Sequence, residues 1–172
     1  MISFGMFYLL LFSLFFLIIT SAVLVRNQLE FHALKQVRQI EITDQPLVSI
    51  CIPARNEEKN ICKTLRKLIN QIGVNYFIII VDDNSTDSTT DIAKKFFKKK
   101  RFKNFKIIKG SKLSKNWSGK IWAMKQGVEF ALKDKEEFYL LFMDADISLE
   151  KNVLKSLVDK LNSEKLEMIS LM

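Results

Sequence analysis

The stretch Tyr76-Phe-Ile-Ile-Ile-Val-Asp-Asp83 is an apolar run that ends abruptly in two carboxylates. A strand that is apolar at every position, rather than at alternate positions, is typical of a strand buried on both faces. A similar run, Val48–Ile52, precedes it, and a third, Phe138–Met143, follows it. We therefore predict an α/β fold with a mainly parallel sheet and helices on both faces.

Apolar residues recur at helical spacing between these runs, which predicts that strands and helices alternate along the chain. The first helix has Ile61, Leu65, Leu68 and Ile69 on its apolar face, with Asn56 as candidate N-cap. We expect a later helix to bury one face, formed by Ile121, Met124, Val128 and Ala131. The other predicted elements are a helix over 88–98, a strand over 105–108, a helix over 153–161 and the start of a further strand over 168–172.

The N-terminus predicts a membrane anchor. Ile2–Val25 contains no charged residue and is long enough to span a bilayer. A cleaved signal peptide is the alternative, but no Lys or Arg precedes the run, and the run exceeds the length of a signal-peptide core. Basic residues follow it from Arg26 onward, which predicts a single-pass protein with its C-terminal domain in the cytoplasm.

We expect three regions within the 172 residues: a transmembrane anchor over 1–25, a juxtamembrane linker over 26–46 and one domain over 47–172. Cys51 and Cys62 suit a reducing compartment, and with a single histidine in the chain they make no metal-binding pattern. We interpret both as core residues.

The net charge of +8 is concentrated in lysine, notably over Lys94–Lys106, where phenylalanines alternate with basic residues. This pattern can indicate a nucleic-acid surface with stacking aromatics. It can also indicate attraction to anionic lipid headgroups. We favour a third interpretation, in which the phenylalanines are buried and the lysines are solvated, so we expect no nucleic-acid partner.

Polar clusters follow the three apolar strands directly. They are Pro53–Glu57, Asp82–Asp87 and Asp144–Asp146. The carboxyl ends of parallel strands meet at one rim of the sheet, where ligands bind in such folds. Such clusters also cap helices, which is our preferred interpretation of Asp87 and Ser88.

Asp144 and Asp146 project from the same side of an extended segment. Close carboxylates repel each other unless a cation neutralises them, and Mg²⁺ or Mn²⁺ held by carboxylates usually also carries substrate phosphates. The loop-to-helix junction Asn116–Lys120 is a further candidate phosphate contact, although it is not a Walker A loop.

In combination, Val48–Glu57, Ile78–Asp87 and the Asp144-Ala-Asp146 motif resemble family 2 glycosyltransferases of the GT-A (Rossmann-like) fold. The string from Asn116 to Val128 is similar to a membrane-anchored subgroup that includes hopanoid-associated glycosyltransferases. The resemblance covers roughly residues 48–172.

This resemblance implies a binding site for a nucleoside diphosphate sugar, with Mg²⁺ or Mn²⁺ as cofactor. The base and ribose would lie against the backbone around Pro53 and Ala54, and against Glu57. Asp82 or Asp83 would accept a hydrogen bond from the base, typically uracil. Lys120 would contact the nucleotide, and Asp144 would reach the ribose or sugar. Asp146 and Asp144 would hold the metal.

The resemblance further implies inverting transfer from a UDP-sugar to a lipid or polysaccharide acceptor. The general base of the family is expected in an acceptor-binding half well downstream of Asp146, so we expect these residues to form the donor-binding half, which a separate chain could complete. We assign no catalytic base. The alternatives are a non-catalytic, membrane-anchored nucleotide-sugar-binding module and a membrane-tethered nucleic-acid binder.

Overall fold

The computed structural model describes residues 4–30, 47–133 and 138–171. The chain divides into two compact units, residues 1–35 and 36–172, which are described separately. The described residues of the first unit form the helix α1 (Phe4–Glu30), whose segment Phe4–Val23 is long and apolar enough to cross a membrane. A signal sequence meets the same criteria of length and composition. Residues 31–46 of the predicted linker lie outside the described residues.

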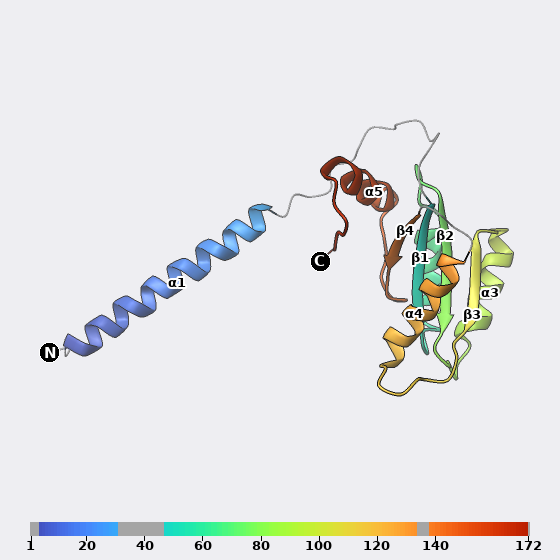
Figure 1. Cartoon of the computed structure of the whole chain (residues 1–172), viewed down its shortest axis with the longest axis horizontal. Coiled ribbons are helices and arrows are strands. Elements are labelled where there is room, and N and C mark those ends of the chain that lie inside the picture. Colours follow the sequence, from blue (N-terminus) through green and yellow to red (C-terminus); the bar gives the residue numbers. More distant parts are fainter. Residues whose placement is uncertain (1–3, 31–46, 134–137, 172) are drawn as a thin grey trace. The chain divides into compact units, whose positions relative to one another are not determined.

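The second unit is a four-stranded parallel sheet flanked by helices (Figure 1). The strand order is β3-β2-β1-β4, which confirms the predicted parallel α/β arrangement. Its elements, in chain order, are β1 (Leu47–Ala54), α2 (Ile61–Leu68), β2 (Tyr76–Asp82), α3 (Thr89–Lys100), β3 (Phe105–Lys109), α4 (Gly119–Leu132), β4 (Phe138–Phe142) and α5 (Val153–Glu164).

The larger hydrophobic core lies between the sheet and helices α2, α3 and α5. Alternate residues of β1 and β2, such as Ile50 and Ile78, point into it. Phe96 and Phe97 of α3 are buried there, and the Phe97 ring stacks on Phe105 with centroids 4.0 Å apart. The structure thus confirms that these aromatic rings belong to the core, which leaves them unavailable for stacking on nucleotide bases.

The smaller core lies on the opposite face, under α4, which lies over β1 and β2 (Figure 1). The buried residues of α4 are Ala123, Gly127 and Ala131, while Ile121 is half exposed. The predicted apolar face of this helix is therefore right for Ala131 and wrong for Ile121, while Met124 and Val128 are half-buried. A Cβ at Gly127 would lie 3.3 Å from both Cys51 and Val81 side-chain atoms, so small residues allow α4 to approach the sheet closely.

Two further predictions are wrong. Asn56 is not the N-cap of α2, because the helix begins at Ile61 after Asn60. Asn56 instead adopts a left-handed backbone with φ of 56°. Residues 168–171 do not form a strand.

Strands β3 and β4 form the two edges of the sheet among the described residues. On β4, the side chains of Leu140 and Phe142 are 37% and 46% exposed. The β4 edge therefore presents apolar side chains to solvent.

Candidate functional site

The register of the sheet brings the three polar clusters to one rim. Ala54 pairs with Asp82 across β1 and β2, and the Asp83 N–H donates to the Ala54 carbonyl at 2.8 Å. On the other side of β1, the Met143 N–H donates to the Cys51 carbonyl at 3.2 Å. The segments that follow β1, β2 and β4 therefore lie next to one another, as the parallel arrangement predicts.

A cavity of about 380 Å³ opens at this rim. It lies where the ends of β1, β2 and β4 meet the N-terminus of α4. Its lining comprises Pro53, Ala54, Arg55, Glu57, Asp83, Gly119, Lys120, Asp144, Ala145 and Asp146. Every residue that we predicted to bind nucleotide sugar or metal is in this set except Asp82.

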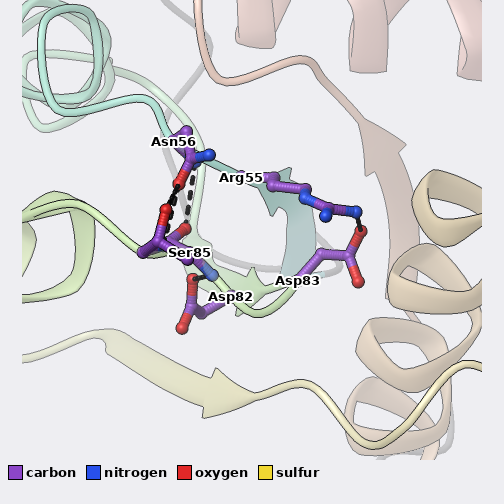
Figure 2. A network of polar contacts seen from close by, with 6 residues as sticks. Arg55, Asn56, Asp82, Asp83 and Ser85 are labelled. Carbon is purple, nitrogen blue, oxygen red and sulfur yellow. Dashed lines mark hydrogen bonds and ion pairs between the residues drawn. The ribbon is translucent and has the colours of Figure 1, made fainter.

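Asp82 and Asp83 point to opposite faces of the sheet because successive strand residues alternate. Ile78 and Ile80 face the larger core, which places Asp82 on that side, whereas Ile79 and Val81 face α4. The Asp82 Oδ1 accepts a hydrogen bond from the Ser85 N–H at 3.1 Å, away from the Arg55–Asp83 pair (Figure 2).

Asp83 is the most enclosed carboxylate of the cavity, with 12% of its side chain exposed. Its Oδ2 lies 3.7 Å from Arg55 Nη1. A Cβ at Gly119 would lie only 2.5 Å from that oxygen, so a larger residue where α4 begins would displace the Asp83 carboxylate. The carboxylate thus lies beside a helix N-terminus, whose dipole stabilises negative charge.

The end of β4 has a different construction. Lys120 Nζ lies 2.7 Å from Asp144 Oδ1, and both side chains are about half exposed. Asp146 is exposed and makes no hydrogen bond or ion pair within the described part of the chain. The backbone between the two carboxylates is held from α2, where the buried Thr64 hydroxyl donates to the Ala145 carbonyl at 2.7 Å.

The loops after β1 and β2 are linked by side chain–backbone hydrogen bonds (Figure 2). The Asn56 N–H donates to Ser85 Oγ at 3.1 Å, and Asn56 Oδ1 accepts from the Thr86 N–H at 2.9 Å. The Glu57 N–H donates to Thr89 Oγ1 at 2.7 Å. These bonds make the two loops one unit.

Asp87 completes this unit at the start of α3. Its carboxylate accepts from the Glu58 N–H at 3.1 Å and from the Thr89 N–H at 2.9 Å, whereas Ser88 makes no side-chain cap. Desolvation raises the pKa of Asp87, but the hydrogen bonds from Thr89 and Glu58 outweigh it and leave the pKa below its ordinary value. The ionised carboxylate is therefore part of the native loop.

Four carboxylates and two cationic side chains line the cavity, which leaves an excess of negative charge. The described residues contain no group of three or more His, Cys, Asp or Glu able to hold a metal by themselves. Asp144 and Asp146 nevertheless fit a hard cation, because carboxylates supply oxygen ligands and Mg²⁺ typically completes its shell with phosphate and water.

Sequence patterns alone gave no role to Arg55 or Thr64. Arg55 lies within the first polar cluster, and its positive charge beside the predicted carboxylates could have identified it as a site residue. Thr64 lies on the buried face of α2, where a hydroxyl group needs a hydrogen-bond partner.

Solved structures share the fold of the second unit. The chain matches S. aureus TarS 1–349 in complex with UDP-GlcNAc with a TM-score of 0.52 and 24% identity, over 69% of this chain and 32% of that one. It matches the mannosyltransferase PcManGT from Pyrobaculum calidifontis, in complex with GDP-Man and Mn²⁺, with a TM-score of 0.51 and 18% identity, over 66% of this chain and 31% of that one. The second unit is therefore an α/β domain of the GT-A fold.

The chain belongs to glycosyl transferase family 2, whose family model matches residues 49–171. Two curated relatives are the 4,4'-diaponeurosporenoate glycosyltransferase of Staphylococcus haemolyticus and the dolichyl-phosphate beta-glucosyltransferase of Saccharomyces cerevisiae. The first is 32% identical over 75% of this chain and 31% of its own length, and the second is 31% identical over 76% and 39%. The chain thus spans about a third of each relative. The narrower resemblance to hopanoid-associated enzymes stays a prediction.

Proposed function

We propose that residues 47–172 bind a nucleoside diphosphate sugar, preferably a UDP-sugar, together with Mg²⁺ or Mn²⁺. In this proposal the domain is the donor site of an inverting glycosyltransferase that acts on a lipid or glycan acceptor. The first unit would anchor it in a membrane, with the domain on the cytoplasmic side. The observation that carries the proposal is the cavity at the strand ends, where carboxylates outnumber cationic side chains.

The charge of this cavity constrains its ligand. A diphosphate would be repelled by an excess of carboxylates unless a divalent cation entered with it. In the proposal Asp146 and Asp144 hold that cation, which when bound would neutralise charge on the departing nucleoside diphosphate.

The chain's own residues would then orient the donor. The Asp83 carboxylate, which pairs with Arg55 and is enclosed beside Gly119, would accept a hydrogen bond from the base. The backbone of Pro53 and Ala54 and the Glu57 carboxylate would hold the base and ribose. Lys120 would supply positive charge to the phosphates in addition to its present contact with Asp144.

We assign no residue of this chain as the general base that deprotonates the acceptor hydroxyl. In the proposal it belongs to an acceptor-binding part, for which the relatives have room in the roughly two thirds of their length that this chain does not match. A separate chain could supply the same part.

Titration calorimetry on the full chain in detergent tests the proposal. UDP-N-acetylglucosamine and GDP-mannose would each be added with Mn²⁺ and with a chelator. We expect Mn²⁺-dependent binding that favours the UDP-sugar and that Asp146→Asn abolishes. Asp91→Asn, which removes an exposed carboxylate on α3, should leave binding intact. Absence of heat with both donors in the presence of Mn²⁺ would refute the proposal.

A further inference from the structure

One surface outside the cavity combines exposed apolar side chains with lysines. It is formed by the loop before α4 and the first turns of that helix. We call it the tryptophan–lysine surface, and its residues are Lys112, Leu113, Lys115, Trp117, Ile121, Trp122 and Lys125. Leu113 and Ile121 are each 50% exposed, and Trp117 is also exposed. The two tryptophans are the only ones in the chain.

The surface is held in a defined shape. The rings of Trp117 and Trp122 lie 5.3 Å apart, and Lys125 Nζ lies 5.1 Å from the centre of the Trp122 ring. Trp122 Nε1 donates to Ser111 Oγ at 3.1 Å, and the Ser111 N–H donates to Gln126 Oε1 at 2.8 Å. These contacts hold the loop against α4, so the exposed apolar side chains have a fixed arrangement.

The charge carried by the segment that forms this surface is almost entirely positive. Between residues 105 and 133 the only carboxylate is Glu129, which pairs with Lys125. The same segment contains Lys106, Lys109, Lys112, Lys115, Lys120, Lys125 and Lys133. Lys112 and Lys115 are exposed and form no ion pair within the part of the chain that the structure describes. The surface therefore suits an anionic partner that also accepts apolar side chains.

We propose that the tryptophan–lysine surface docks on a bilayer that contains anionic lipids. Tryptophan prefers the membrane–water interface, aliphatic side chains enter the acyl boundary, and each lysine near the surface gains from anionic headgroups. A nucleic acid is disfavoured as the partner, since the half-exposed aliphatic groups of Leu113 and Ile121 offer it no stacking face.

Docking would bring the donor cavity to the membrane surface. Gly119 and Lys120, at the start of the same helix, line that cavity. This proposal does not depend on the proposed function, because the surface can bind lipid whether or not the cavity binds a donor. A donor site held at this level would serve a lipid-linked acceptor.

Tryptophan fluorescence tests the proposal directly, because both tryptophans of the chain lie in the surface. The full chain would be reconstituted into phosphatidylcholine vesicles with and without phosphatidylglycerol, and with brominated phospholipids as quenchers. We expect blue-shifted emission and quenching in the anionic vesicles, both weakened by salt. Lys112→Glu combined with Lys115→Glu should lower the docked-to-undocked ratio at least about tenfold.

A matched control makes the same change of charge on the other face of the sheet. Lys98→Glu combined with Lys99→Glu alters exposed residues of α3 and should leave the quenching at the wild-type level. Equal loss in both double variants would overturn the proposal, since net charge would then suffice. Emission that vesicles leave unchanged, or that only an added oligonucleotide shifts, would also overturn it.

Discussion

The ends of β1 and β2 differ from the end of β4 in how they are held. The first two are tied to each other by hydrogen bonds such as those of Asn56 with Ser85 and Thr86. At the end of β4 the backbone is held by Thr64, while Asp144 contacts only Lys120 among the described side chains and Asp146 is exposed. In the proposed donor site, one side is therefore pre-organised, and the other is left to be completed by a cation and its ligand.

Within this comparison the largest expected effect comes from Asp83, which directly follows β2, set against Asp82, the last residue of β2, whose side chain points the other way. Asp83→Asn should weaken Mn²⁺-dependent binding of the UDP-sugar roughly 10- to 100-fold, because hydrogen bonds to charged groups contribute roughly 1.5–3 kcal/mol. Asp82→Asn should leave the affinity near that of the wild type, since its carboxylate lies outside the cavity. Calorimetric Kd values measure both. The reverse ranking would contradict the placement of the base beside Asp83.

Thr64 tests how firmly the β4 end is supported. Thr64→Val leaves the Ala145 carbonyl without its buried donor and should lower the free energy of unfolding by about 2–3 kcal/mol. Urea unfolding followed by tryptophan emission measures this loss. Thr64→Ser retains the hydroxyl, so it should keep the Mn²⁺-dependent affinity for the UDP-sugar that Thr64→Val lowers. A serine variant with the low affinity of the valine variant would show that the hydroxyl does not position Asp144 and Asp146.

Asn56 tests the pre-organised side. Asn56→Ala loses the side-chain hydrogen bonds and replaces asparagine, which tolerates a φ of 56°, with a residue that does not, which should cost about 2 kcal/mol of unfolding free energy. Asn56→Gly removes the same hydrogen bonds but tolerates the backbone, so it should cost less. The same urea titration ranks the two. If Asn56→Gly lost more unfolding free energy than Asn56→Ala, the left-handed backbone would not be the main cause of the loss.

The smallest expected effect is the pH dependence of Asp87. Its pKa is lower in the folded protein, so its contribution to stability is complete above the unfolded value of about 3.9 and is lost as the pH falls through the folded value. Wild type should be slightly more stable than Asp87→Asn at neutral pH, and the difference should vanish on acidification. Thermal melts of the two proteins at a series of pH values measure the gap. A gap that persists in strong acid would contradict this assignment.

The sheet and its functional rim were predictable from the sequence because unbroken apolar runs such as Tyr76–Val81 have few structural alternatives. Polar residues at their carboxyl ends must then lie on one rim. The choice between Asp82 and Asp83 was not predictable in this way. It depends on which face of β2 meets α4, and a run that is apolar at every position carries no sign of its two faces.

The buried face of α4 was mispredicted for a related reason. Periodicity favours large apolar residues such as Ile121 as the core face, whereas the structure buries Ala123 and Gly127. Close approach of a helix to a sheet requires small residues, and their low hydrophobicity makes them a weak signal. Asn56 was similarly misassigned, because a left-handed turn and an N-cap favour the same residue type.

The exposed apolar edge at β4 has a practical consequence for handling the protein. An edge strand with Leu140 and Phe142 facing solvent can recruit a strand from another molecule. Samples of this chain should self-associate as concentration rises, and Leu140→Lys should improve their solubility. Light scattering across a dilution series would detect the change.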